Sequence, residues 1–295
     1  MFPGGFYPCG TLDNSATIRA MKIAILSDIH GNLPALEAVA ADIERWQPDV
    51  VLVNGDSVNR GPDSPGCWQF VQQRGWAHTR GNHEEYMIER LDANYPQDKR
   101  YVPLFWMSSW TFRQFNGEVA ALQSLPEGVS RFAPDGSECR LRHASMRGNT
   151  DNVTAVSPFD TIRAQIAPPP AVFATAHTHH PFVRVVDQTI VVNSGSVGSP
   201  SDGDVRPSYA RIHWQDGVWS AEIARVSYDR EQALDAFRHS GFMEGAGPMA
   251  WLVYHEWRAA EIFVTPWRQQ YEAAVLDGQI DMETAVAEFL RAYHL

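Results

Sequence analysis

The chain has 295 residues, of which 44% are hydrophobic and 20% are charged, and its formal net charge at pH 7 is −11. This composition is typical of a globular protein that buries a large core. The negative charge disfavours binding to a nucleic-acid polymer, because such binding needs a basic surface. An anionic substrate must therefore be held by local positive charge, and bound divalent metals are an obvious source of it.

Three cysteines, Cys9, Cys67 and Cys139, are widely spaced and include no C-x-x-C pair. They suggest neither a disulfide framework nor a thiolate zinc site, and a reducing compartment fits them best. No apolar run reaches the roughly 18 residues needed to span a bilayer. The first twenty residues also lack the basic start and apolar stretch of a signal peptide. We therefore expect a cytoplasmic protein that does not insert into membranes, and the oligomeric state stays open.

Residues 1–20 show no periodicity and are predicted to form an N-terminal tail. After them, short apolar runs alternate with segments whose apolar residues repeat at helical spacing. Such alternation implies βαβ units. The predicted strands lie at 22–27, 49–53 and 76–79, and the predicted helices at 33–43 and 64–74.

The rest of the chain changes character twice. Residues from about 84 to 125 are helical in pattern and rich in aromatic side chains, which predicts a helical insertion beside the site. A β-rich part follows and predicts a second sheet packed on the first. Residues 228–295 form a C-terminal helical extension without a chemical motif, which could cover the site, pack on the core or mediate association. We expect one main domain at 21–227, with later strands at 139–143, 171–176, 182–186, 189–192, 209–214 and 218–226.

Polar residues follow several of the predicted strands, where each strand is expected to end. Strand ends of an α/β sheet are the places where functional sites gather. Residues two apart in a strand project from the same side, so an Asp-x-His or His-x-His pair could hold one ion. The clusters are Asp28-x-His30, Gly55-Asp56, Gly81-Asn82-His83-Glu84 and His177-x-His179.

The residue types in these clusters favour a catalytic metal site. Neutral imidazoles, carboxylates and an amide oxygen suit Mn²⁺, Fe or Zn²⁺, whereas the lack of thiolates argues against a closed structural zinc site. Asp56 is suited to bridging two ions, and a hydroxide that bridges them would be ready for in-line attack on phosphorus.

Together with His143, these ordered motifs resemble those of the calcineurin-like metallophosphoesterases over residues 22 to about 212. The resemblance implies a four-layer αββα sandwich, here with the helical insertion and the C-terminal helical extension added. It also implies two divalent metal ions, for which manganese is the first expectation and iron, zinc, nickel or magnesium are alternatives. The implied ligands are Asp28, His30, Asp56 and His179 for one ion, and Asp56, Asn82, His143 and His177 for the other.

The same resemblance implies roles for residues beside the metals. His83 would lie outside the metal shell, orient the phosphate and protonate the leaving oxygen. Arg60 would clamp phosphate oxygens as a catalytic and substrate-binding residue, and Asn59 is a second candidate for substrate binding. Asn59 stands where the phosphatase motif has an Asp that orients the catalytic histidine. Either Glu84 or another acid supplies that hydrogen bond, or His83 acts with weaker orientation.

Two branches of the superfamily share features with this chain. Residues 55–61 and 80–84 resemble the serine/threonine protein phosphatases, whereas 177–179 and 192–198 resemble small bacterial and archaeal phosphodiesterases. The second likeness fits the length better, so we expect hydrolysis of a phosphodiester or related small phosphate ester. A serine/threonine-type protein phosphatase is one alternative. A non-catalytic scaffold of the same fold is another, which the complete set of ligand types argues against.

Overall fold

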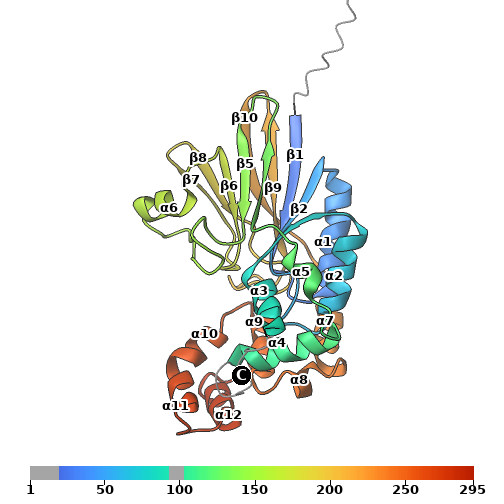
Figure 1. The fold of residues 1–295 in the computed structure, drawn as a ribbon, viewed down its shortest axis with the longest axis vertical. Coiled ribbons are helices and arrows are strands. Elements are labelled where there is room, and N and C mark those ends of the chain that lie inside the picture. The colour runs from blue at the N-terminus through green and yellow to red at the C-terminus, as the bar shows by residue number, and fades with distance from the viewer. Residues whose placement is uncertain (1–19, 93–102) are drawn as a thin grey trace, which may run out of the picture.

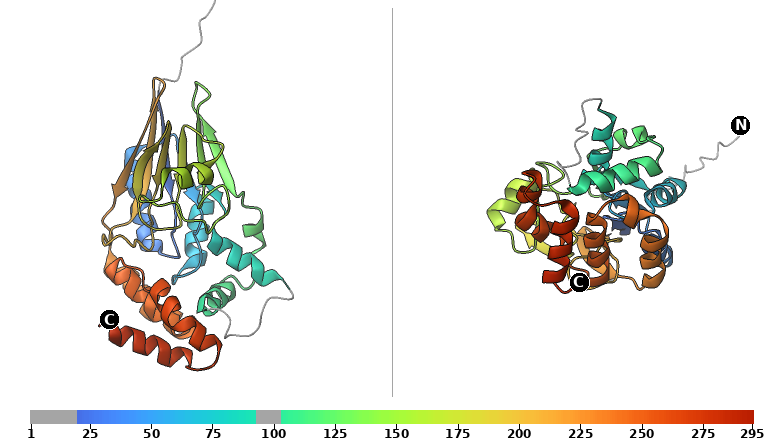
Figure 2. Two further views of the ribbon diagram at one scale, coloured as in Figure 1. Left: turned by 90° about the vertical axis from the view of Figure 1, so that its left-hand side faces the viewer. Right: turned by 90° about the horizontal axis from the view of Figure 1, so that it is seen from below.

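The computed structural model describes residues 20–92 and 103–295. Within these residues the strands form two five-stranded sheets, in the orders β10-β9-β1-β2-β3 and β4-β5-β6-β8-β7. Figures 1 and 2 show the two sheets face to face, with many helices gathered beneath one end of their strands. The predicted tail lies outside the described residues, apart from Ala20, which begins β1. The strands are β1 (Ala20–Leu26), β2 (Val50–Asn54), β3 (Ala77–Thr79), β4 (Gly128–Phe132), β5 (Glu138–Arg142), β6 (Val172–Thr175), β7 (Phe182–Val186), β8 (Thr189–Asn193), β9 (Ser208–Gln215) and β10 (Val218–Arg225).

The first sheet has a parallel centre, in which β1 pairs with β2 and β2 with β3, and an antiparallel edge of β9 and β10. Side chains alternate along a strand, so Ile23 and Ile25 of β1 face the second sheet while Ala24 and Leu26 face helices. Those helices are α1 (Leu33–Trp46) and α2 (Ser64–Gln73). The apolar sequence of β1 follows from burial on both faces.

Helix α1 begins where the side chain of Asn32 accepts the N–H of Ala35, and α2 begins where Asp63 accepts the N–H of Gly66. Both are N-cap hydrogen bonds, which satisfy backbone donors that a helix leaves free at its start. The helices therefore start just after the loops that follow β1 and β2. These loops hold residues of the candidate site.

The second sheet has β5, β6 and β8 parallel, with β4 and β7 antiparallel at its two edges. Residues of both sheets, such as Ile212 and Val192, form one core between them. Helix α6 (Phe159–Ile166) covers the outer face of the second sheet and completes the four-layer αββα sandwich, so the predicted fold class is confirmed. Neither α6 nor β4 was predicted. Both are short, and α6 buries only two large apolar side chains, Ile162 and Ile166, which gives little periodic signal.

The insertion and the C-terminal extension pack together. Met107 and Trp110 of α4 share one core with Phe237, Trp257 and other residues of the extension. We call α4 together with α7 to α12 the helical layer; it lies beneath the strand ends (Figure 2). Because part of the insertion belongs to this layer, the boundary at 227/228 stays a prediction. The remaining helices are α3 (Asn82–Ile88), α4 (Pro103–Gln114), α5 (Ala120–Gln123), α7 (Arg230–His239), α8 (Phe242–Gly245), α9 (Met249–Ala259), α10 (Val264–Trp267), α11 (Ala273–Leu276) and α12 (Met282–Ala292), with helical turns at Glu89–Leu91 and Arg268–Glu272.

The helices of the described residues include none that is long and apolar enough to cross a membrane.

Candidate metal centre

The predicted ligands lie on loops at one end of the two sheets, next to the helical layer. They follow the strands β1, β2, β5 and β6, except Asn82, which begins α3 after β3. The prediction that paired ligands project from one side of an extended strand is wrong, because the strands end earlier and the backbone turns into the left-handed region. Such a backbone is costly for residues other than glycine and is concentrated at functional sites. The φ angles are 51° for Asp28, 49° for His30, 55° for Asp56, 66° for His177 and 58° for His179.

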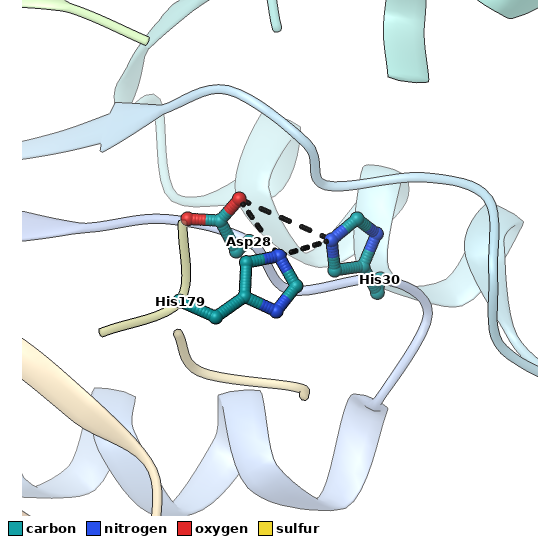
Figure 3. A group of neighbouring side chains, drawn as sticks. All are labelled: Asp28, His30 and His179. Atoms are coloured by element: carbon teal, nitrogen blue, oxygen red, sulfur yellow. Dashed lines mark hydrogen bonds and ion pairs between the residues drawn. The ribbon is translucent and has the colours of Figure 1, made fainter. Parts of the chain in front are cut away.

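The loops nevertheless bring Asp28, His30 and His179 together, as Figure 3 shows. Oδ1 of Asp28 lies 3.3 Å from Nε2 of His179 and 3.9 Å from Nε2 of His30. The two Nε2 atoms are 3.1 Å apart. Two residues 149 positions apart in the sequence thus present ring nitrogens to the same point.

The tautomers of these two histidines follow from their outer hydrogen bonds. Nδ1 of His30 lies 3.3 Å from the carbonyl oxygen of Asn59, and Nδ1 of His179 lies 2.6 Å from that of Ser199. A carbonyl oxygen only accepts, so each Nδ1 carries a hydrogen, and in the neutral form of each ring Nε2 keeps a lone pair. Two lone pairs at 3.1 Å repel each other unless a cation lies between them, and a histidine held this way is a usual metal ligand.

Asp56, His143 and His177 form a neighbouring group. Nε2 of His143 lies 3.2 Å from Oδ2 of Asp56 and 3.0 Å from Oδ1 of Asn82. Its Nδ1 lies 2.8 Å from the carbonyl oxygen of Asn54, which leaves Nε2 facing the group. Oδ2 of Asp56 is also 3.9 Å from Nε2 of His30, so Asp56 lies between the two groups.

Two carboxylate oxygens give an independent test of whether these residues fit a metal. Oδ1 of Asp28 and Oδ2 of Asp56 are buried and have no hydrogen-bond partner among the described residues. Their other oxygens are bound, since Ser27 donates to Asp28 Oδ2 and the N–H of His83 donates to Asp56 Oδ1. An unpartnered buried carboxylate oxygen is costly. A divalent cation supplies the missing partner, so the donor set fits a metal centre.

The pKa values of His143 and His177 also fit a metal centre. Burial alone would lower the pKa of His143, but the carboxylates of Asp56 and Asp28 outweigh it and raise the pKa to about 10. Burial lowers the pKa of His177 to about 4. The carboxylates that attract a proton to His143 would attract a metal cation in its place.

The orienting partner of His83 is Asn59. The side-chain nitrogen of Asn59 lies 3.0 Å from Nδ1 of His83, and its oxygen accepts the backbone N–H of Arg60 and the hydroxyl of Thr111. A backbone N–H only donates, so the amide oxygen is fixed on Arg60 and the NH₂ group faces the ring. Nδ1 of His83 therefore accepts, and the neutral ring carries its hydrogen on Nε2. Burial lowers the pKa of His83 to about 3.

Glu84 does not orient His83. Its carboxylate accepts the backbone N–H groups of Asp56, Ser57 and Gly81 at 2.8 to 2.9 Å. Burial, together with the charge of Asp56, raises the pKa of Glu84 to about 7. Glu84 thus connects the loop after β2 to the start of α3 by hydrogen bonds. The suggestion that Glu84 supplies the hydrogen bond that orients His83 is wrong.

Asn59 and Arg60, the predicted substrate-binding residues, are adjacent in a turn with φ angles of 67° and 63°. The side chain of Asn59 is fully buried, and its substrate contact stays a prediction. The guanidinium of Arg60 pairs with Glu256 of α9. Sequence patterns drew attention to neither Thr111 nor Glu256, since both lie on helices without a chemical motif.

The fold and the ligand clusters together define a metal-dependent phosphoric ester hydrolase. A family model described as calcineurin-like phosphoesterase matches residues 21–188, and the chain belongs to this family. An uncharacterized protein of Methanocaldococcus jannaschii, MJ0912, is 25% identical over 252 residues, which cover 78% of this chain and 97% of that protein. The metallophosphoesterase from Sphaerobacter thermophilus is 26% identical with a TM-score of 0.63, covering 82% of this chain and 99% of the other. The hypothetical protein PH1004 from Pyrococcus horikoshii OT3 shares the fold at 18% identity, with a TM-score of 0.66 over 78% and 97% of the two chains.

Proposed function

We propose that the protein hydrolyses a phosphodiester or a related small phosphate ester with two divalent metal ions, manganese being the first candidate. One observation carries this proposal: the ligand atoms of Asp28, His30 and His179 lie within 4.8 Å of one another, as do those of Asp56, His143 and His177. Oδ2 of Asp56 lies 3.9 Å from Nε2 of His30, so Asp56 connects the two groups. Two ions a few ångströms apart that share a carboxylate are typical of enzymes that cleave phosphate esters.

Each ion would take most of its ligands from one group, and Asp56 would serve both. Asp28, His30, Asp56 and His179 would hold the first, and Asp56, Asn82, His143 and His177 the second. When bound, the ions would polarise the phosphoryl group and lower the pKa of water, so that hydroxide is available for in-line attack on phosphorus.

The protein itself would orient and stabilise the reacting groups. The rings of His83 and His30 form a T-shaped contact with centroids 4.7 Å apart, and one ring nitrogen of His83 lies within 4.8 Å of the ligand atoms of His30 and Asp56. His83 would donate a hydrogen bond from Nε2 to the leaving oxygen. A leaving group of low pKa needs only this hydrogen bond, whereas an alkoxide needs the proton as well. Arg60 would bind the non-bridging phosphate oxygens.

The burial of the ligands favours a small substrate over a phosphoprotein. Of the seven proposed ligands, His179 is 7% exposed, the other buried ones are less exposed still, and His177 is half-buried. The helical layer also reaches this end of the sandwich through the Arg60–Glu256 pair. A compact ester can approach such a site more easily than a residue on a folded protein.

A panel of three substrates tests the proposal. The protein is treated with a chelator, reloaded with Mn²⁺, checked for two metal ions per chain, and assayed with bis-p-nitrophenyl phosphate, p-nitrophenyl phosphate and a phosphopeptide. We expect the diester or the small monoester to be hydrolysed fastest, and activity to need the metal. A strong preference for the phosphopeptide would instead establish a protein phosphatase. No turnover in the metal-verified protein would point to a non-catalytic scaffold.

A further inference from the structure

Helix α9 of the C-terminal extension places a buried carboxylate against the active-site turn. Oε2 of Glu256 accepts a hydrogen bond from Nη2 of Arg60, across 196 positions of sequence. The side chain of Glu256 is 3% exposed and that of Arg60 is 16% exposed. A carboxylate this deeply buried needs a cationic partner, and Arg60 provides it.

Glu256 is itself held rigidly. Its second oxygen, Oε1, accepts the backbone N–H groups of Phe263 and Val264 at 2.8 and 2.9 Å. One oxygen is thus fixed by the backbone at the start of α10, and the other is left for Arg60. Such a carboxylate does not adjust its position, so it fixes the position of the guanidinium.

Helix α9 is anchored on the same turn by close packing. A Cβ atom on Gly61 would lie 1.9 Å from the carbonyl oxygen of His30 and 3.0 Å from the ring of Trp257, so the turn has room only for glycine. Trp257 in turn packs on Phe237, with ring centroids 4.4 Å apart. The helical layer therefore packs against the turn at Gly61, which itself lies against the loop that carries His30, and it also contacts the side chain of Arg60.

The guanidinium keeps donors for a further ligand. Its Nε is buried and has no acceptor in the part of the chain that the structure describes. Arginine has five N–H donors in a planar fork, so a single hydrogen bond through Nη2 leaves others for an oxyanion. The turn also lies beside the metal ligands, since the carbonyl oxygen of Asn59, the residue before Arg60, lies 3.3 Å from Nδ1 of His30.

We infer that Glu256 is a positioning residue, which holds the guanidinium of Arg60 where it binds a phosphate oxygen of the substrate. The C-terminal extension is then part of the substrate site. The inference rests on the proposed function, because it needs a phosphate ester as the ligand. Its physical basis is preorganisation: a long, flexible side chain fixed before binding loses less conformational entropy when the substrate arrives.

A double-mutant cycle on the metal-loaded protein tests this inference. The variants are Glu256→Gln, Arg60→Gln and the double variant, with metal content and thermal unfolding measured for each. We expect Glu256→Gln to lower kcat/KM roughly 10-fold, mainly through KM, and Arg60→Gln to lower it about 100-fold. The double variant should match Arg60→Gln within about two-fold, because Glu256 acts through Arg60.

A second readout does not depend on turnover. We expect the Kd for inorganic phosphate, measured by calorimetry on the metal-loaded protein, to rise about 10-fold in Glu256→Gln and to be unaffected by that change when Arg60 is already Gln. If the wild-type protein binds phosphate but hydrolyses no ester, the proposed function fails while this coupling can still be measured. If it hydrolyses esters but shows no coupling, only the role of Glu256 fails.

The matched control is Asp235→Asn, which breaks an exposed pair with Arg238 in the same helical layer and should leave both readouts unchanged. If Glu256→Gln does not fold, Glu256→Asp replaces it in the cycle, since it keeps the charge but shortens the reach. Equal losses with and without Arg60 would overturn the inference. Tighter phosphate binding by Glu256→Gln would also overturn it, because Glu256 would then be masking the guanidinium.

Discussion

The metal ligands and the Asn59–Arg60 turn lie side by side and are linked by His30, whose Nδ1 donates to the carbonyl oxygen of Asn59. Their other contacts come from different parts of the molecule. Among the ligands, His143 and His179 are oriented by backbone carbonyls of Asn54 and Ser199, both in or next to the sandwich. The turn depends on side chains of the helical layer, Thr111 from α4 and Glu256 from α9. The sandwich therefore builds the metal centre, and the helical additions position the residues that would meet the substrate.

Asp56→Asn, a change in the metal centre, should have the largest effect. The change removes the charge shared by both groups of ligands, and we expect metal content to fall and turnover of the diester to drop on the order of 10³-fold. Metal analysis and steady-state kinetics on the same preparation measure both. The control is Asp204→Asn, which alters a surface carboxylate paired with Arg206. Full turnover by Asp56→Asn with two bound metals would contradict the proposed role of Asp56.

His83→Asn should separate chemistry from metal binding. We expect two metal ions per chain as in the wild type, and kcat lower by about 10²-fold, because the hydrogen bond to the leaving oxygen is lost. The loss should be smaller for a p-nitrophenyl ester than for a phenyl ester, whose leaving group is more basic. Equal losses for both esters would show that His83 does not act on the leaving group.

His78→Phe should change how the stability of the sandwich depends on pH. His78 lies on β3, and neither ring nitrogen has a hydrogen-bond partner in the described ranges. Burial lowers its pKa from 6.5 to about 3. Below pH 6.5 the unfolded chain therefore binds a proton that the folded protein does not, and stability falls as the pH falls towards 3. At pH 5 this costs the wild type about 2 kcal/mol relative to neutral pH.

Urea unfolding at pH 7.5 and pH 5, with a chelator present at both, measures the His78 effect. The decrease in unfolding free energy between these pH values should be about 2 kcal/mol smaller in His78→Phe than in the wild type. The other histidines titrate in both proteins, so their contributions cancel in the difference. An equal decrease in both would show that His78 is charged in the folded state.

Thr111→Val, a change in the helical layer, should have the smallest effect. The change keeps the shape of the side chain but removes the hydroxyl that donates to Asn59 at 3.3 Å. We expect a loss of about 1 kcal/mol, which corresponds to about a five-fold lower kcat with unchanged metal content. Ser124→Ala, which removes an exposed hydroxyl bound to Ala121, is the control. An effect on metal content would mean that the change also displaces the backbone of Asn59, whose carbonyl oxygen accepts from His30.

The two regions also differ in how well sequence could predict them. The ligands of the metal centre belong to short motifs at strand ends, and strand ends meet at one edge of a sheet whatever the details of packing. The left-handed backbone at Asp28 and His179 was not predicted, but it did not change which residues converge. The short elements β4 and α6 were not predicted, because a segment of so few residues shows no clear periodicity of its apolar side chains.

The partners of the turn could not be predicted in this way. The hydrogen bond from Asn59 to His83 depends on which way one amide points, and that is fixed by the backbone N–H of Arg60 and by Thr111 on another helix. Glu256 is 196 residues from Arg60 in a helix whose sequence suggests only packing. No local pattern connects such residues.

The sequence by itself determined the alternation of strands and helices apart from short elements such as β4 and α6, and it determined the ligand types and the family, because each depends on local periodicity or on short motifs. Only the tertiary structure decided what surrounds the metal centre. It showed that Glu84 ties loops together, that Asn59 orients His83, and that the C-terminal extension reaches Arg60 through Glu256. These contacts depend on how the helical layer docks on the sandwich, and docking is fixed by buried side chains such as Trp257 that are distant in sequence from the turn they touch.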